Sequence, residues 1–257
     1  MPNPISNFPV ITIDGSSGAG KGTLTARLAK ALDYAMLDSG ALYRIVGLMA
    51  NKAGLLQDVD NHSQSNDELA KQLGKLTQSL DIRFIPHQSQ NDNHHNQPLS
   101  EHIGVWVKGE NVTHTIRTEQ VGEYASKVAV FGSVRDALLT LQKNMADPNH
   151  TQANGLIADG RDMGTVVFPH ANLKIYLIAS AEARAQRRVS QLANAGKTAD
   201  IDEILAQIIA RDERDSSRSV APAKPADDAI IIDSSSLSAD EVYAQVWQLC
   251  QERGLAS

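Results

Sequence analysis

A glycine-rich run that ends in a lysine is the strongest chemical signal in the sequence. The run, GSSGAGKGT at residues 15–23, follows a short β-branched stretch and precedes an amphipathic helical pattern. In this setting glycines let backbone N–H groups converge on phosphate oxygens, the helix N-terminus adds a positive dipole, and the lysine reaches the terminal phosphates. The residues expected to bind phosphates are Gly15, Ser16, Ser17, Gly18, Ala19, Gly20, Lys21, Gly22 and Thr23.

A second chemical signal lies at ADGRDMG, residues 158–164, directly after an apolar strand pattern. Charged groups at the carboxyl end of a parallel strand lie at the ligand-binding edge of the sheet. We expect Asp159 to support Mg²⁺ or its water shell and Arg161 to bind a phosphate. Gly22 replaces the hydroxyl residue that normally follows the lysine and binds the metal, so Thr23 is the other candidate ligand. A purely structural Asp-Gly turn is the alternative.

Two further groups could bind anionic ligands. In DSGALYR, residues 38–44, Ser39 is expected to cap a helix that carries Arg44; a cap and a surface arginine are the alternative. Later, Arg211, Arg214, Asp215 and Arg218 fall on one face of a continuing helix, after Arg187 and Arg188. Such a run is often only a solvated face. However, seven of the 13 arginines lie between 161 and 218, which favours several phosphates and phosphoryl-transfer chemistry.

Alternating strand and helix patterns must position these residues. Strands are expected at Phe8–Ile13, Leu156–Ala158, Leu173–Ala179 and Ala229–Asp233. Helices are predicted by apolar faces at 24, 28, 31 and 32; at 121, 125 and 128; at 134, 138, 141 and 145; at 201, 204, 205 and 208; and at 242, 246, 249 and 250. Ser238 and Glu241 form a capping box before the last helix. We therefore expect an α/β fold with a mostly parallel sheet.

The segment from about Asn61 to Arg117 breaks this alternation. Asp81–Ile85, His102–Lys108 and Asn111–Ile116 resemble strands, with a turn at Gly109–Asn111. The polar stretch His87–Gln97 includes His94 and His95, but its composition is typical of a solvated hairpin loop rather than a metal site. The segment is expected to be an inserted antiparallel subdomain.

The composition excludes several classes of protein. The chain has 257 residues and a net charge of -6, which argues against general binding to nucleic acid or membrane surfaces. We find no apolar run long enough to span a membrane and no secretory signal. Cys250 is the only cysteine, which excludes an internal disulfide and a Cys-based zinc site. We expect a cytoplasmic protein.

The motifs GSSGAGKGT, LDSGALYR, IADGRDMGTVVFP and RDERDSSR together closely resemble those of bacterial cytidylate kinases, and the resemblance spans nearly the whole chain. It implies a P-loop kinase fold, with a mostly parallel sheet flanked by helices, an inserted antiparallel β subdomain and a helical lid. It implies a single domain (1–257) with a nucleoside-monophosphate-binding subdomain at 39–130, an insertion at 61–117 and a lid at 180–220. The implied activity is transfer of the γ-phosphoryl of ATP to CMP or dCMP, with Mg²⁺, by a monomer.

The resemblance also assigns roles by matching position. It assigns recognition of the cytosine base to Ser39, Ser126, Arg135 and Asp162. It assigns binding of the acceptor's phosphate to Arg44, Arg161 and Arg218, and binding of its sugar to Arg211 and Asp215. Arg187, Arg188 and Arg214 fall in the lid. The residues expected to neutralise the negative charge of the phosphoryl group during transfer are Lys21, Arg161, Arg188, Arg214 and Arg218. Asp162 can accept from the cytosine amine while Arg135 donates to its acceptor atoms. No dedicated general base is expected.

Three alternatives remain at this point. One is a kinase for another small acceptor, such as UMP, AMP or a non-nucleotide acid. A second is a P-loop GTP-binding switch, which would need an Asn-Lys-x-Asp motif; the pair Asn51-Lys52 is followed by Ala53 and Gly54 instead. A non-catalytic regulatory relative is the third, and it is disfavoured because Lys21 and the arginines are present.

Overall fold

The computed structural model describes residues 8–57, 67–86, 103–150, 153–194, 196, 198–216 and 224–256. The chain forms two compact units, which we call the core unit (residues 1–37 and 146–257) and the inserted unit (residues 38–145). The core unit is therefore discontinuous in sequence, whereas the inserted unit is continuous. Among the described residues, no helix has the length and apolar character needed to cross a bilayer.

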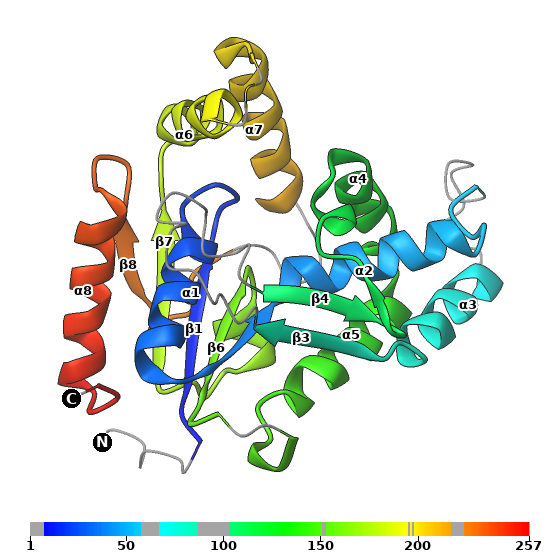
Figure 1. Cartoon of the computed structure of the whole chain (residues 1–257), viewed down its shortest axis with the longest axis horizontal. Coiled ribbons are helices and arrows are strands. Elements are labelled where there is room, and N and C mark those ends of the chain that lie inside the picture. Colours follow the sequence, from blue (N-terminus) through cyan, green and yellow to red (C-terminus); the bar gives the residue numbers. More distant parts are fainter. Residues whose placement is uncertain are drawn as a thin grey trace. The chain divides into compact units, whose positions relative to one another are not determined.

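The core unit is built on a five-stranded sheet in the order β2-β6-β1-β7-β8 (Figure 1). The strands are β1 (Val10–Gly15), β2 (Ala35–Asp38), β6 (Leu156–Gly160), β7 (Leu173–Ile178) and β8 (Ile230–Asp233). The four strands from β6 to β8 pair in parallel. β1 and β7 are almost entirely buried, as expected for strands covered on both faces. The prediction of a mostly parallel α/β sheet is confirmed, with strand ends shifted by up to two residues.

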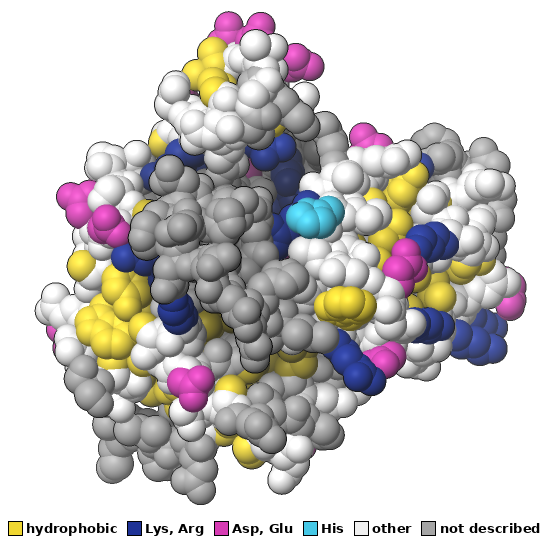
Figure 2. Space-filling model, viewed as in Figure 1, with side chains coloured by type: hydrophobic (Ala, Val, Ile, Leu, Met, Phe, Trp, Pro, Cys, Tyr) yellow, Lys and Arg dark blue, Asp and Glu magenta, His cyan; other side chains and the backbone are white. Residues whose placement is uncertain are grey.

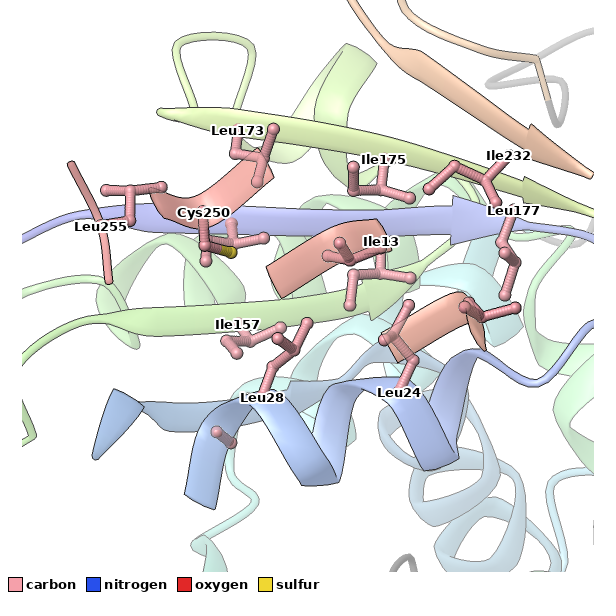
Figure 3. Close-up of a cluster of buried hydrophobic side chains, with 14 of the residues drawn as sticks. Ile13, Leu24, Leu28, Ile157, Leu173, Ile175, Leu177, Ile232, Cys250 and Leu255 are labelled. Carbon is pink, nitrogen blue, oxygen red and sulfur yellow. The ribbon is translucent and has the colours of Figure 1, made fainter. Parts of the chain in front are cut away.

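Two helices, α1 (Lys21–Leu32) and α8 (Ala239–Glu252), pack over one face of the sheet. In Figure 3, Leu24 and Leu28 of α1 point toward Ile13 and Ile157 of the sheet, in the same buried cluster as Cys250 of α8. The predicted stripe of α1 is wrong at Ala31, which is exposed. The buried side of α1 continues through Thr25 and Ala29, neighbours of Leu24 and Leu28 on the helix surface.

The same two helices also meet at the surface. The Arg27 guanidinium lies 4.3 Å from the centroid of the Tyr243 ring, which stacks on Trp247. Hydrophobic side chains are visible over this region in the lower left of Figure 2. The capping box of Ser238 and Glu241 is present and opens α8 as predicted.

The core unit also carries a pair of helices, α6 (Ala181–Asn194) and α7 (Ile201–Ser216), which pack on each other. α7 contains positions 211, 214 and 215, as the spacing predicts, whereas Arg218 lies outside the described residues. Its predicted apolar stripe is wrong at Ile201, which is 41% exposed because it is the first residue of the helix.

The inserted unit contains four α-helices among its described residues and a small antiparallel sheet in the order β3-β4-β5. The helices are α2 (Ser39–Lys52), α3 (Asp67–Gln78), α4 (Glu119–Val128) and α5 (Gly132–Asn144), and the strands are β3 (Ile82–Pro86), β4 (Ile103–Val107) and β5 (Glu110–Asn111). α2 packs on α4, and α3 packs on α5. The expected antiparallel sheet is present, and the polar stretch His87–Gln97 lies outside the described residues.

The third strand of this sheet is much shorter than predicted. β5 has two residues, and a 3₁₀ helix, η2, follows at Thr115–Arg117. The turn is at Lys108 and Gly109, which have φ angles of 50° and 83°, and not at 109–111. The strand ends early because Thr113 Oγ1 accepts the Val105 N–H at 2.8 Å and replaces the backbone partner that a longer strand would supply.

The helix α3 was not expected in a segment interpreted as antiparallel strands. Leu69 and Leu73 are buried four residues apart, and Asp67 and Glu68 stand in the first turn. Acidic residues there complement the helix dipole, so the spacing and the charges together were a usable signal for this helix.

Candidate active site

The predicted phosphate loop connects β1 to α1 at the carboxyl edge of the sheet. Gly15 has φ 140°, and a Cβ at this position would overlap the carbonyl of Leu177 in β7. The residue before α1, Gly20, is in the left-handed region with φ 98°. These two positions therefore require glycine, and the loop delivers the chain to a helix N-terminus that begins at Lys21, as anion binding needs.

Lys21 lies across the loop and close to a carboxylate. Its Nζ donates to the Ser16 carbonyl at 3.0 Å and is 3.8 Å from Asp159 Oδ1. Both side chains are largely covered, with 12% and 15% exposed. A Cβ on Gly22 would be 3.8 Å from Asp159 Oδ2, so this carboxylate also adjoins the first turn of α1. The structure thus brings Lys21, Gly22 and Asp159 together, while Thr23 is half-buried in the same turn.

The turn carrying Arg161 and Asp162 follows β6 directly. Both side chains are half-buried, and a five-residue π-helix, η4 (Met163–Val167), comes next. Asp14 of β1 accepts hydrogen bonds from the backbone N–H groups at the start of η4. Burial raises the pKa of Asp14 to about 6, opposed by the N–H groups of Gly164 and Met163. The sequence motifs predict no role for Asp14, so this contact is one that the sequence interpretation missed.

The α6 arginines divide between anchoring and exposed positions. Arg187 donates to the carbonyl of Ser234, at 3.3 Å to its hydroxyl, and at 3.5 Å to the Ala19 carbonyl of the phosphate loop. Arg188 is exposed. Arg187 therefore fastens α6 to the loop and to the end of β8.

On α7, Arg211 is exposed. Arg214 and Asp215 are placed by their backbone in the last turns of α7.

Arg184 is a residue that the sequence interpretation overlooked. It is 4% exposed, and its Nη1 donates to Asp212 Oδ1 of α7 at 3.0 Å and to the Ser17 carbonyl at 3.2 Å. Its Nε donates to the Ala179 carbonyl at 3.1 Å. One buried guanidinium thus joins the phosphate loop, the end of β7 and both helices of the pair. An arginine in a polar helix usually indicates a solvated face, so its spacing of three and four from Arg187 and Arg188 was the only signal.

The inserted unit holds the other predicted site residues. Asp38, and not Ser39, caps α2, because its carboxylate accepts the Ala41 N–H at 2.9 Å. The prediction that Ser39 is the cap is therefore wrong. Ser39 is the first residue of α2, is 5% exposed, and accepts a hydrogen bond from Gln142 Nε2 of α5 at 3.0 Å. Gln142 is a buried polar residue that the sequence interpretation missed.

Arg44 and Ser126 are brought together in the inserted unit, around Gly122. Arg44 Nη1 donates to the carbonyls of Ile116 and Thr118, at 2.7 and 2.9 Å. A Cβ on Gly122 would be 3.1 Å from Arg44 Nη2, and the Ser126 hydroxyl donates to the Gly122 carbonyl at 3.2 Å. Arg135 lies half-buried on α5. The guanidinium of Arg44 is therefore oriented by the backbone that leads into α4.

Comparison with known proteins decides the family. A family model described as cytidylate kinase matches residues 11–252. The chain belongs to the cytidylate kinase family. It is 49% identical to a cytidylate kinase of Pasteurella multocida (strain Pm70) over 248 residues, 96% of this chain and 97% of the relative. It is 50% identical to those of Acinetobacter baumannii (strain SDF), over 91% of this chain and 92% of the relative, and Mannheimia succiniciproducens, over 92% and 93%.

One structural neighbour is much less similar in sequence than these relatives. An uncharacterized protein from Eubacterium ventriosum ATCC 27560 has a TM-score of 0.47 and 9% identity, over 96% of this chain and 99% of that one. This likeness carries no argument about function. Membership of the cytidylate kinase family rests on the sequence relatives.

The described residues of this cytidylate kinase family member offer few side chains that could bind a metal. Among the residues that the structure describes, no three His, Cys, Asp or Glu side chains are grouped for a metal. Asp159 nevertheless presents a carboxylate beside Lys21 and Gly22. Mg²⁺ usually takes one or two protein oxygens and completes its shell with phosphate and water. A single carboxylate at this site is therefore compatible with an Mg²⁺ ion that nucleotide phosphates and water also coordinate.

Proposed function

We propose that this chain transfers the γ-phosphoryl group of ATP to CMP or dCMP and produces CDP or dCDP. The observation that carries the proposal is a phosphate loop next to the motif DGRDMG, at one edge of the sheet. Asp14, which directly precedes the loop, is paired in register with Gly160 of that motif. Both features lie within the cytidylate kinase match at residues 11–252.

The ATP phosphates are assigned to the loop residues 15–23. Backbone N–H groups and the dipole of α1 supply fixed positive potential, and Lys21 supplies a charge beside the terminal phosphates. Asp159 and Thr23 are assigned to Mg²⁺ or its water shell, and the ion would neutralise phosphate charge when bound. Fixed charges of this kind stabilise a phosphoryl transition state in which charge spreads over the equatorial oxygens.

The acceptor is assigned to individual residues by their match to the family motifs. Asp162 accepts from the cytosine amine, and Arg135 donates to the ring nitrogen or carbonyl, with Ser39 and Ser126 completing the set. Uracil presents a carbonyl and a protonated nitrogen at those two positions, so the Asp162 carboxylate would face a second acceptor and Arg135 would face a second donor. A missed buried hydrogen bond costs about 1–3 kcal/mol, which discriminates the bases.

The arginines bring the charge that the transfer needs. Arg44, Arg161 and Arg218 are assigned to the acceptor's phosphate, and Arg211 with Asp215 to its sugar. Arg188 and Arg214 belong to the proposed lid, whose closure would exclude water that otherwise competes as acceptor. A general base is not required, because the acceptor phosphate is already nucleophilic. The cytoplasmic location, the monomeric state, and the bounds 39–130, 61–117 and 180–220 stay predictions.

The test is ADP release from ATP and Mg²⁺ with CMP, dCMP, UMP, AMP, GMP and shikimate offered separately. We expect CMP and dCMP to give the highest kcat/KM, by about tenfold or more over UMP, as one lost hydrogen bond implies. A preference for another acceptor would keep the phosphate assignments and overturn the cytosine assignments. If none of these acceptors stimulates ADP release, the phosphotransferase proposal is wrong.

A further inference from the structure

Asp14, the next-to-last residue of β1, is bonded to the segment that follows Arg161 and Asp162. Asp14 is 5% exposed. Its Oδ1 accepts the Met163 N–H at 2.9 Å, and its Oδ2 accepts the Gly164 N–H at 2.7 Å. Hydrogen bonds to a carboxylate are stronger than those to a neutral acceptor. The carboxylate therefore fixes the first two residues of η4 to the central strand.

The same residue also restrains the chain on the other side of the turn. Asp14 is paired in parallel register with Gly160, the last residue of β6. Arg161 and Asp162 are thus the two residues between a backbone attachment at 160 and a carboxylate attachment at 163 and 164. A displacement of the backbone at either residue would therefore disturb one of the two attachments.

The two glycines that flank the turn show how closely it is seated. A Cβ on Gly160 would be 2.6 Å from Met163 Cγ, and one on Gly164 would be 2.9 Å from Thr12 Oγ1 and 3.3 Å from Asp14 Oδ2. Thr12 Oγ1 is itself buried, with no hydrogen-bond partner among the described residues. The segment after the turn therefore rests directly on the side chains of β1, with no room for another atom.

A buried carboxylate is unfavourable unless something compensates it. Burial alone would favour an uncharged residue at position 14, and it raises the pKa of Asp14 to about 6. The compensation comes mainly from the two hydrogen bonds to η4 and, to a smaller extent, from the charge of Lys21. The phosphate-loop strand therefore retains a charge whose described backbone partners belong to the neighbouring motif.

We propose that Asp14 is a positioning residue for acceptor recognition, which acts by fixing the backbone that presents Arg161 and Asp162. The inference rests on the proposed function, because it takes the acceptor to be CMP or dCMP. It concerns the acceptor more than ATP, since the two hydrogen bonds go to the DGRDMG segment and not to the phosphate loop. Asp14 does not touch either substrate in this proposal.

The first test is the Asp14→Asn variant. The asparagine keeps the shape and one acceptor oxygen, but its NH₂ group faces a backbone N–H, so one of the two attachments is lost. We expect kcat/KM for CMP to fall by about tenfold or more and the CMP-to-UMP ratio of kcat/KM to fall with it. The Kd for the ATP analogue AMP-PNP should change by less than about threefold, which is less than half of the binding free energy of a tenfold change.

Two further variants separate positioning from general damage. Gly164→Ala disturbs the same seat from the other side and should reproduce the selective CMP defect. Val246→Ala removes buried side-chain volume from α8, outside the turn. Even if this variant is less stable, its CMP-to-UMP ratio of kcat/KM should be unchanged. A parallel loss of AMP-PNP and CMP affinity in Asp14→Asn and Gly164→Ala would overturn the inference in favour of a merely structural role.

The background variant Asp162→Ala supplies the decisive comparison. If Asp14 determines base selectivity through Asp162, Asp14→Asn should not change the CMP-to-UMP ratio further once Asp162 is gone. A further fall in that background would contradict the inference. Wild-type protein without CMP-dependent ADP release would instead contradict the proposed function, so the two failures are distinguishable.

Discussion

Lys21 combines a fixed position with the charge that the proposed phosphoryl transfer needs. It lies between the Ser16 carbonyl and the Asp159 carboxylate, and its side chain is 12% exposed. We expect Lys21→Ala to lower kcat by roughly 10²–10³-fold, the scale found when one preorganised charge or donor is removed. Steady-state ADP release measures the effect, and circular dichroism checks the fold. Lys30→Ala, on an exposed position of the same helix, is the matched control. Retained turnover in Lys21→Ala would remove this lysine from catalysis.

The free energy of unfolding should depend on pH through the protonation of Asp14. Its folded pKa of about 6 lies above the usual 3.8 because of burial, with Asp162 raising it and Lys21 lowering it to smaller extents. Between these two pH values the folded chain binds more protons than the unfolded chain. The stabilisation that comes from protonation of Asp14 is therefore fully present below about pH 4. It is lost as the pH rises through 6 and is absent at higher pH.

This sign can be measured against a variant that does not titrate. From pH 5 to pH 7 the linkage predicts that wild type loses about 1 kcal/mol relative to Asp14→Asn in the free energy of unfolding. Urea denaturation of both proteins at the two pH values provides the numbers. A difference that stays constant with pH would mean that Asp14 does not titrate as its burial implies.

At the scale of elements, an ion pair between Arg184 and Asp212 joins α6 to α7. Arg184 is 4% exposed and Asp212 is half-buried, and the guanidinium also binds the Ser17 and Ala179 carbonyls. Arg184→Met should lower the free energy of unfolding by about 2–4 kcal/mol, since it leaves a carboxylate and two carbonyls without their donor. Arg188→Met, on the exposed side of α6, should change it by less than about 0.5 kcal/mol. Equal effects of the two substitutions in urea denaturation would contradict this account.

Element types were predictable where several local signals indicate the same structure. The run from β1 through the loop to α1 combines a buried apolar stretch, obligatory glycines and an apolar face with helical spacing, and all three indicate the same structure. Elements whose ends depend on one side chain were not predictable. Asp38 and Ser39 are both good helix caps, and only the backbone decides that Asp38 takes the role. Likewise, Thr113 ends the third strand through a bond that no periodicity reveals.

The candidate site was predictable for the same reason and to the same extent. Lys21 and Asp159 follow from motifs with a fixed geometry, and the structure places them 3.8 Å apart. Asp14, Arg184 and Gln142 did not follow, because their partners are backbone groups or side chains far away in the sequence. A buried polar residue is recognised only when its burial is known, and burial is a property of the fold.

At the scale of the whole molecule, the two units differ in how the chain builds them. The core unit needs two separate stretches of chain, whereas the inserted unit is one continuous stretch, residues 38–145. The alternation of strand and helix patterns indicated the sheet but not its order, which places β1 between β6 and β7. That order joins residues about 150 positions apart, a relationship that local patterns cannot carry.

This connectivity has a consequence for synthesis on the ribosome. β1 is made first, but its two hydrogen-bonded neighbours are β6 at 156–160 and β7 at 173–178. The central strand and the phosphate loop therefore wait for some 140 further residues before they can pair, while the inserted unit is already complete in the emerging chain. Contacts between distant residues form slowly, and domains tend to fold as units as they emerge. The unit that interrupts the core in the sequence is thus expected to fold before the core that surrounds it.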